Sequence, residues 1–563
     1  MGFWQLGNTS VRSAMRIRDG LIAYSQSAIQ GDIRRVEGDI AFRELLGKSG
    51  VVSLGEDKTN SVGRKWRAAM CKLGFLYPEI KQTMGFTQND LGPLDMITPS
   101  GWDLIRAETV PAMQECFLRA MVTPMTEMED GKTFSPLCWT MAILVEIKQR
   151  GLEPVLNFVE IAYIVQTTTP VNGVKETVDR ILSLRKERER AERKRVFDRE
   201  LYARGAVEQK RAEGTFRDYA DMNIRYLKAS GMVQAKGKGI SLIPEKYALA
   251  VELSKELSFD MSPLDLYRTL CKGSELPTDN SEVANEVLRE LLEQLKAYDI
   301  SYSVAGKPLD TPAQINQVRY EIEELIFEQK EVAYANAQAS QWEEIAEYMD
   351  LIASKKDKKR VSEDEEIRIP RTEAPAYLEW SLWRAFLAID SLANKPYEVR
   401  NFKIDQDFLP VSTAPGRMPD LVAEFNDCVI VIEVTLSESS RQEAMEGEPV
   451  RRHVADLVAE YNKPVYGLFI ANRIDTNTAE TFRTGIWYSQ DDVMQRLQIV
   501  PFTLKQFSFF FRKMFTTNNH SPENVVSLLS SCGAKRDALN APEWKLEIEK
   551  QVRNAAFVSG TKL

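Results

Sequence analysis

Histidine is almost missing from this chain, and the chemistry that depends on it is largely excluded. Only two histidines, His453 and His520, occur among 563 residues. Most zinc sites and catalytic triads need histidine, so carboxylates remain as the expected acid–base and metal-binding groups. The six cysteines are scattered without the spacing of a metal site. This favours unpaired thiols in a reducing compartment, and we expect the protein to be cytoplasmic.

Long apolar segments are absent as well. No run approaches the roughly 20 residues that a membrane helix needs. The first residues carry several arginines without an apolar core, which does not match a signal peptide. No GxxxxGK[ST] motif occurs, so a P-loop ATPase is not supported. The hydrophobic content of 44% and the charged content of 28% are ordinary for a soluble protein of several domains, and we expect no membrane partner.

The net charge of −9 conceals an uneven distribution of charge along the chain. Residues 1–245 hold 36 Lys and Arg against 31 Asp and Glu, a balance of +5. The remaining residues hold 37 against 51, a balance of −14. A mildly basic front half and an acidic rear half are compatible with a DNA-contacting part joined to a part that bears carboxylates.

Two segments of the front half share one pattern. In each, a helix-like stretch (64–74 and 222–231) ends in glycine and is followed by a short strand, a turn and a second strand. The second strands, 96–99 and 240–244, end in a proline that opens a new helix. This order is typical of the last helix and wing of a winged helix-turn-helix, which places a helix in the major groove. The alternative is a helix–hairpin unit with only a structural role.

The middle of the chain is predicted to be mostly helical. Residues 184–196 form a charged segment of alternating sign, which is either a solvated helix with ion pairs four residues apart or a phosphate-contacting helix. Residues 250–365 carry long helical patterns and fit a spacer between working domains. The highly charged run 354–366 precedes Pro370 and favours an exposed linker.

The motif with the clearest chemistry is Arg417-Met-Pro-Asp420, followed by Glu433-Val-Thr435. Between them, residues 421–425 and the apolar run 428–434 flank Asn-Asp and read as a hairpin. Because a hairpin returns its second strand beside the first, Asp420 and Glu433 should converge at one end of a small sheet. Two carboxylates placed in this way are suitable ligands for Mg²⁺.

The elements around this hairpin complete a recognisable order. A helix at 376–393 carries Glu379, a strand-like stretch at 399–404 follows, and after the hairpin come a helix at about 441–461 and an apolar strand at 465–471. This α-β-β-β-α-β order is that of the PD-(D/E)xK nuclease core. Phosphodiester cleavage needs a cation, and Asp420, Glu433 and the backbone carbonyl of Val434 are the predicted ligands.

The stretch from Arg417 to His453, with Ile432-Glu-Val-Thr435 and Met445-Glu-Gly-Glu-Pro-Val-Arg-Arg-His453 inside it, closely resembles the AlwI-like type IIS restriction endonuclease family. Residues 467–471 and 499–507 resemble that family too. The resemblance implies binding of a short asymmetric site in double-stranded DNA and Mg²⁺-dependent cleavage a few base pairs away, with Mn²⁺ as another usable cation.

By position, the resemblance makes Asp420 and Glu433 metal ligands and makes Glu379 and Glu446 further active-site carboxylates. Thr435 stands where most PD-(D/E)xK nucleases carry lysine. His453 is a further candidate catalytic residue. Three of these residues have an alternative role: Glu379 as a helix-surface residue, Glu446 as a favourable charge near a helix N-terminus, and His453 as a packing or phosphate-contacting residue rather than a base.

We therefore expect a multidomain α+β protein. Residues 1–248 would form a DNA-recognition region with two winged-helix-like units, 249–368 a helical linker domain, and 369–563 an α/β PD-(D/E)xK-like nuclease domain. One active site cuts one strand, so double-strand cleavage would need a transient dimer on DNA or a second catalytic subunit. The alternatives are a strand-specific nicking enzyme and a non-catalytic winged-helix regulator.

Overall fold

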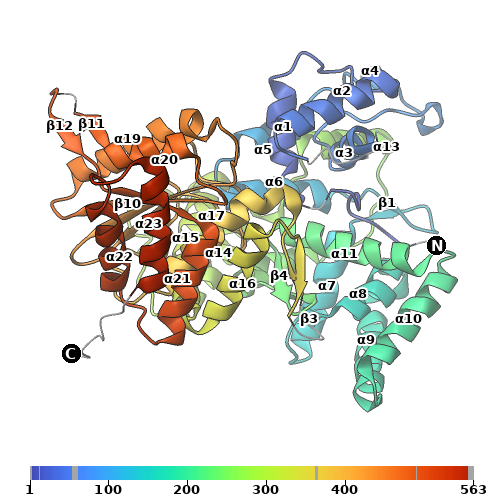
Figure 1. Ribbon diagram of the computed structural model, residues 1–563. Helices are drawn as coiled ribbons and strands as arrows, with labels where there is room; N and C mark the ends of the chain where they lie inside the picture. The colour runs from blue at the N-terminus through green and yellow to red at the C-terminus, as the bar shows by residue number, and fades with distance from the viewer. Residues whose placement is uncertain (1–2, 12, 53–60, 362–365, 490, 556–563) are drawn as a thin grey trace. The chain divides into compact units, whose positions relative to one another are not determined.

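The computed structural model describes residues 3–11, 13–52, 61–361, 366–489 and 491–555 (Figure 1). The chain divides into two compact units, Met1–Ile326 and Phe327–Leu563. The three-part division predicted from the sequence stays a prediction. In the structure, residues 249–326 belong to the first unit, and residues 327–368 belong to the second.

The first unit is mainly helical. Its longer helices are α1 (Ile17–Ser25), α2 (Arg35–Lys48), α3 (Ser61–Lys72), α5 (Pro99–Arg106), α6 (Val110–Val122), α7 (Pro136–Gln149), α9 (Val174–Arg190), α10 (Lys194–Glu208), α11 (Glu213–Ala229), α13 (Pro263–Lys272), α14 (Ser281–Leu295) and α15 (Pro312–Asn336), which continues into the second unit. Shorter helices are α4 (Gln88–Leu91), α8 (Phe158–Tyr163) and α12 (Tyr247–Leu253). The strands are β1 (Thr126–Glu127) with β2 (Thr133–Phe134), and β3 (Val155–Leu156), β5 (Gly239–Leu242) and β4 (Val233–Lys236) in that order in one antiparallel sheet.

The second repeated segment of the front half contains the expected succession of elements, and the first contains it only in part. In the second, α11 ends before Gly231, β4 and β5 pair as a hairpin, and a turn at Pro244–Lys246 leads into α12. In the first, α3 ends before Gly74, and the predicted strands are reduced to one bridge between Leu76 and Ile97 before α5 begins at Pro99. In the part of the chain that the structure describes, the first segment therefore lacks the regular hairpin that the second contains.

The charged segment 184–196 is not one helix. The chain breaks between α9 and α10, and Arg188 of α9 makes a two-pronged ion pair with Asp198 of α10 (2.7 and 2.9 Å). Arg185 likewise binds the buried carboxylate of Glu160 (2.8 and 3.0 Å). Some of the basic side chains of this segment therefore hold neighbouring elements together.

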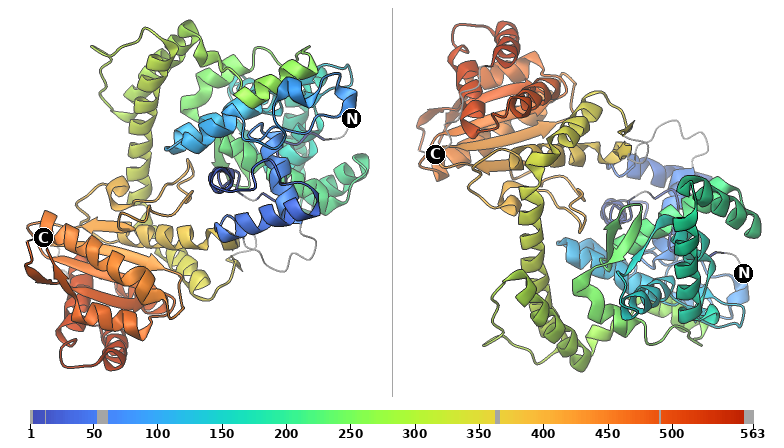
Figure 2. Two further views of the ribbon diagram at one scale, coloured as in Figure 1. Left: turned by 90° about the horizontal axis from the view of Figure 1, so that it is seen from above. Right: turned by 90° about the horizontal axis from the view of Figure 1, so that it is seen from below.

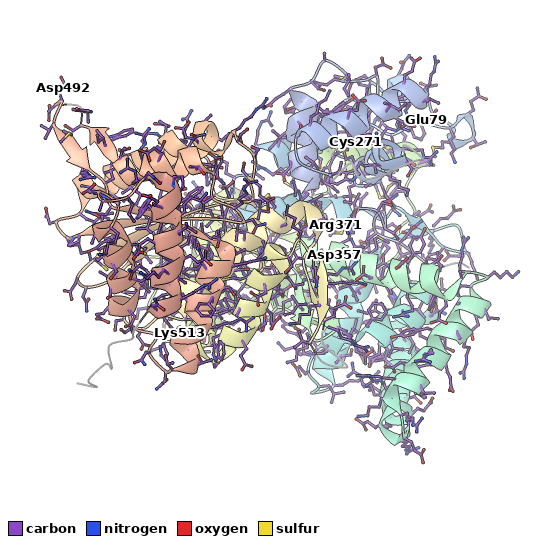
Figure 3. All side chains as sticks on the ribbon, in the orientation of Figure 1. Glu79, Cys271, Asp357, Arg371, Asp492 and Lys513 are labelled. Carbon is purple, nitrogen blue, oxygen red and sulfur yellow. The ribbon has the colours of Figure 1, made fainter. Side chains whose placement is uncertain are left out.

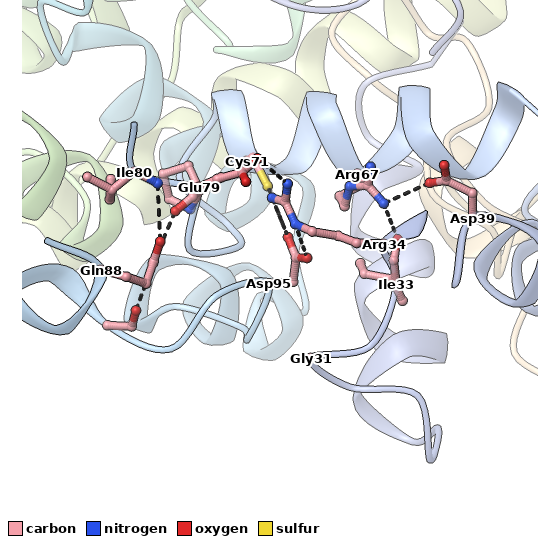
Figure 4. A network of polar contacts seen from close by, with 12 residues as sticks. Gly31, Ile33, Arg34, Asp39, Arg67, Cys71, Glu79, Ile80, Gln88 and Asp95 are labelled. Carbon is pink, nitrogen blue, oxygen red and sulfur yellow. Dashed lines mark hydrogen bonds and ion pairs between the residues drawn. The ribbon is translucent and has the colours of Figure 1, made fainter. Parts of the chain in front are cut away.

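A polar network fixes the inner side of α3 (Figure 4). Arg34 holds the fully buried Asp95 through two hydrogen bonds of 2.6 and 3.0 Å. Arg67 of α3 pairs with Asp39 of α2 at 2.7 Å and also donates to the carbonyl of Ile33. Because these contacts are directional, they set the orientation of α3 relative to α2.

The second unit is built around a four-stranded sheet in the order β13-β10-β9-β8. Its strands are β8 (Leu421–Glu424), β9 (Val429–Thr435), β10 (Val465–Ala471) and β13 (Ile499–Thr503), and two small hairpins pair β6 (Lys358–Arg360) with β7 (Glu366–Arg368) and β11 (Ile486–Tyr488) with β12 (Met494–Arg496). The helices are α16 (Trp342–Ala353), α17 (Ala374–Leu387), α18 (Pro396–Val399), α19 (Gln442–Glu460), α20 (Thr476–Thr484), α21 (Leu504–Thr516), α22 (Pro522–Ala534) and α23 (Ala541–Asn554).

Helices cover both faces of this sheet (Figure 2). β9, β10 and β13 are parallel, and β8 runs antiparallel to β9. Such central strands are buried on both faces, which explains the continuous apolar runs of β9 and β10. A side chain at Gly467 of β10 would meet Val454 of α19 at 2.9 Å, so glycine permits α19 to lie close to the sheet.

Two predicted features of this unit differ in the structure. The stretch 399–404 is not a regular strand, because it makes only isolated bridges, from Arg400 to Leu421 and from Ile404 to Pro410. The charged run 354–366 is only partly a free linker, since β6 pairs with β7 and the following Ile367 is buried in the core. Residues 362–365 of this run lie outside the described residues.

Ion pairs near this run differ in their exposure. Asp357 and Arg371, labelled in Figure 3, approach to 3.5 Å with both side chains exposed. Arg400 and Glu331, in contrast, make two hydrogen bonds of 2.7 and 2.8 Å, and Glu331 is fully buried.

None of the helices in the described residues is long and apolar enough to cross a membrane.

We predict that Glu331→Ala destabilises the second unit by about 3–5 kcal/mol, because Arg400 is left without its partner in a poorly hydrated site. Urea unfolding followed by tryptophan fluorescence should show a lower midpoint. The matched control is Glu448→Ala, which removes the partner of Arg452 in a more exposed pair on α19 and should change stability by no more than about 0.5 kcal/mol. Equal effects of the two variants would contradict this prediction.

Candidate active site

The β8–β9 hairpin brings Asp420 to the end of β9 that carries Glu433. Leu421 pairs with Ile432, so Asp420, the residue before β8, lies beside Glu433 and Val434. The backbone N–H of Val434 donates to Oδ2 of Asp420 at 2.7 Å. The register of the hairpin therefore fixes both carboxylates, as the sequence predicted.

Asn401 anchors the segment that precedes β8. Its side chain donates to the carbonyl of Pro419 at 2.7 Å, and its backbone N–H donates to the carbonyl of Asp420 at 3.3 Å. Asn401 was not singled out from the sequence. It lies in a stretch that resembles a strand, where the pattern gives no sign of a side chain that reaches another segment.

Glu379 is a buried residue of α17, with 5% of its surface exposed. One carboxylate oxygen accepts a hydrogen bond from the backbone N–H of Ala414 at 2.8 Å. On the same helix, the indole of Trp380 donates to the carbonyl of Phe408 at 2.6 Å, which holds the loop that carries Ala414. The alternative reading of Glu379 as a helix-surface residue is therefore wrong.

Glu433 and His453 form a buried pair across β9 and α19. Nδ1 of His453 and Oε1 of Glu433 are 2.6 Å apart, and the two residues are 4% and 8% exposed. Among the described residues, Nε2 of His453 is buried and has no hydrogen-bond partner. This contact places His453 next to the carboxylate that the sequence motif had identified.

Glu446 lies one helical turn into α19 and is half-buried. Gln442 sets the start of this helix: its fully buried amide donates to the carbonyls of Ser437 (2.8 Å) and Arg473 (2.9 Å). The side chain of Thr435 lies close enough to Glu446 to lower the pKa of its carboxyl group. Thr435, which occupies the position expected for lysine, thus contacts an acidic residue of the site.

The carboxyl groups of the site hold their protons more tightly than usual. Burial raises the pKa of Glu379 to about 9, with a further contribution from the charge of Asp420. Burial raises the pKa of Glu433 to about 8, and the charge of Glu446 adds to it. The pKa of Asp420 is raised well above its ordinary value by burial and by Glu433. Burial also raises the pKa of Glu446 and lowers that of His453.

These shifts reflect carboxyl groups that are buried near one another, with His453 as the one basic side chain of the described residues in contact with them. Among the described residues, no lysine or arginine forms an ion pair with any of the four carboxylates. Hard oxygen donors with uncompensated charge are suited to a divalent cation. The described residues contain no group of three or more His, Cys, Asp or Glu side chains arranged to hold a metal. Backbone or water oxygens would therefore have to complete the coordination of a cation at Asp420 and Glu433.

Three of the solved structures that are similar to this chain have low TM-scores. The small subunit R.BspD6I2 of the heterodimeric restriction endonuclease R.BspD6I is 23% identical over 37% of this chain and 98% of its own, with a TM-score of 0.29. The BpuJ1 endonuclease binding domain, solved in complex with modified DNA, is 13% identical over 45% and 88%, with a TM-score of 0.28. Restriction endonuclease FokI is 11% identical over 93% and 99%, with a TM-score of 0.25. TM-scores this low support no argument about the fold.

The comparison with curated proteins gave no match. The family model described as AlwI restriction endonuclease matches residues 71–509, which include all six candidate site residues: Glu379, Asp420, Glu433, Val434, Glu446 and His453. Because this match covers more than half of the chain, the protein belongs to the AlwI restriction endonuclease family and is a site-specific nuclease.

Proposed function

We propose that the protein is a type IIS restriction endonuclease that binds a short asymmetric site in double-stranded DNA and cuts a few base pairs away with Mg²⁺. The observation that carries this proposal is the carboxylate cluster of Asp420, Glu433, Glu379 and Glu446 at one end of the β8–β9 hairpin. These residues lie on α17, directly before β8, on β9 and on α19, which supports a PD-(D/E)xK-like site with Thr435 in place of lysine. The family assignment argues against the alternative of a non-catalytic regulator.

Asp420 and Glu433 would hold Mg²⁺, or Mn²⁺ in its place, with the carbonyl of Val434 as a third ligand. A bound cation would activate water and neutralise charge that develops on the phosphate. The bound cation would also lower the carboxyl pKa values, which burial raises in the metal-free protein. His453 orients Glu433 through its 2.6 Å contact, and Thr435 orients Glu446.

The remaining parts of the chain would bind the recognition sequence, and the nuclease domain would cut the DNA a few base pairs away from it. The two helix–hairpin segments, with α3 and α11 as their helices, fit winged-helix-like units for this task. Separate reading and cutting regions explain cleavage outside the recognition site. A strand-specific nicking enzyme would use the same residues and is the second candidate.

We predict that purified protein cuts plasmid DNA with Mg²⁺ and that run-off sequencing of both strands shows one recognition sequence and a constant offset between that sequence and the cut.

Asp420→Asn and Glu433→Gln should each lower the cleavage rate by about 10²–10³-fold or more, because a metal-holding charge is lost. Binding to DNA in EDTA should persist. The control is Glu448→Gln on the exposed side of α19. Full cleavage by Asp420→Asn would falsify the site assignment.

We predict that Glu379→Gln stabilises the metal-free protein at alkaline pH. A carboxyl group with a raised pKa keeps its proton in the folded state after the unfolded chain has lost it, so stability falls as pH rises from about 4.5 to about 9. The amide can still accept the hydrogen bond of Ala414 without this penalty. Melting temperatures in EDTA should show an advantage of the variant that grows across this range.

The control for this experiment is added Mg²⁺ at about pH 8. The cation should raise the melting temperature of the wild type, because it binds the folded state, and it should raise that of Asp420→Asn much less. An advantage of Glu379→Gln that is the same at every pH would contradict the electrostatic explanation, since neutral packing does not titrate.

We also predict that two catalytic domains must pair for double-strand cleavage, either in a transient dimer on DNA or with a second catalytic subunit. For the dimer, the rate of double-strand cleavage should rise with enzyme concentration more steeply than the rate of nicking. Mixing active enzyme with Asp420→Asn should increase the share of nicked product. Persistent nicking at high enzyme concentration would instead favour the nicking enzyme.

A further inference from the structure

The two helix–hairpin segments of the first unit present very different helices to their surroundings. α3 contains Arg64, Lys65, Arg67 and Lys72 and no acidic residue. α11 contains three basic and three acidic residues, namely Arg217, Arg225 and Lys228 with Glu213, Asp218 and Asp221. The two segments share a pattern of elements, but only α3 carries an excess of positive charge.

The basic residues of α3 form an open stripe. Arg64, Ala68 and Lys72 are exposed, and their spacing of four residues places them along one side of the helix. Lys65 lies at the edge of the stripe and is half-buried. Among the described residues, Arg64, Lys65 and Lys72 form no ion pair. No described residue therefore neutralises the charge of this stripe, although the surrounding protein lowers the pKa of Lys72 to about 8.

The opposite side of α3 is firmly held. Trp66, Ala69 and Met70 are buried, and Arg67 pairs with Asp39 (Figure 4). At Gly63, an added side chain would meet the carbonyl oxygen of Asp39 at 2.3 Å, so α3 lies directly against α2. A helix held in this way presents its outer stripe in a fixed direction, which favours specific recognition.

α11 is also held firmly, but two of its three basic residues are paired with acidic residues of the same helix. Arg217 pairs with Glu213 at 3.8 Å, and Arg225 pairs with Asp221 at 3.1 Å. The beginning of the chain also covers the helix. The backbone N–H of Leu6 donates to Asn223 at 2.9 Å, and Arg225 donates to the carbonyl of Val11 at 2.7 Å.

We propose that α3 is the helix that enters the DNA groove, with Arg64 and Lys72 on phosphates or base edges, and that α11 has a structural role. This rests on the proposed function, since it assigns the recognition of DNA to one of the two predicted units. Ala68, between the two cations, lets the backbone of α3 approach the DNA closely. An α-helix fits the major groove of B-DNA, where base edges can be distinguished.

The test measures binding separately from cleavage. Wild type and variants are titrated in EDTA against a fluorescein-labelled pool of random-sequence duplexes, and bound duplexes are sequenced. Arg64→Ala and Lys72→Ala should each weaken binding about 10-fold at moderate salt and reduce the salt dependence by about one counterion. Ala68→Glu should weaken binding more, because it places a negative charge in the centre of the stripe.

The matched control is Arg217→Ala, which removes an exposed arginine from α11. It should leave affinity and selected sequences unchanged, whereas Arg64→Ala should broaden the selected sequences or lower affinity uniformly. Melting curves of all variants should match the wild type, because each substituted side chain is exposed.

Wild-type affinity in both Arg64→Ala and Ala68→Glu would overturn the proposal, and so would an equal loss of affinity in Arg217→Ala. Failure of the proposed cleavage site would look different. In that case Asp420→Asn would still cut DNA, while the α3 variants would still lose affinity.

Discussion

The burial of several carboxyl groups near one another is the constraint on which the second unit depends. Glu379, Asp420, Glu433 and Glu446 come from four different elements, and burial raises the pKa of each. Bringing them together costs stability unless they are protonated or bind a cation. The fold accepts this cost at one end of its sheet and offsets it with an extensive apolar core around β9 and β10. Because a bound divalent cation would offset the cost of burying these carboxylates, such a site favours tight binding of that cation.

The elements around the site mainly fix the positions of its carboxyl groups. The hairpin register and the Val434 N–H fix Asp420, Asn401 holds the segment before it, and Gln442 sets the start of α19. His453 contributes through Glu433. These contacts are directional hydrogen bonds from neutral groups, so they restrict the geometry of the carboxylates without neutralising them. That combination leaves the negative charge available for a cation.

In the first unit, by contrast, many charged side chains are paired with side chains of opposite charge. Most of its prominent arginines are committed to internal carboxylates, as in Arg34 with Asp95, Arg119 with Asp279 and Arg185 with Glu160. The slight positive balance of the front half is therefore a poor guide to its binding surface. What matters is which cations remain unpaired, and α3 differs from α11 in that respect although both belong to the same sequence pattern.

The sequence by itself determined the local features: the β8–β9 hairpin with Asp420 and Glu433, the helices with Glu379 and Glu446, and the order of the two helix–hairpin segments. These follow from alternating or helical apolar patterns and from turn residues, which act over short distances. Only the tertiary structure decided the rest. It replaced the predicted strand at 399–404 with isolated bridges, split the charged helix between α9 and α10, buried Glu379, and joined His453 to Glu433. These outcomes depend on contacts between residues far apart in the chain, and hydrogen bonding and burial at such distances leave no periodic signal in the sequence.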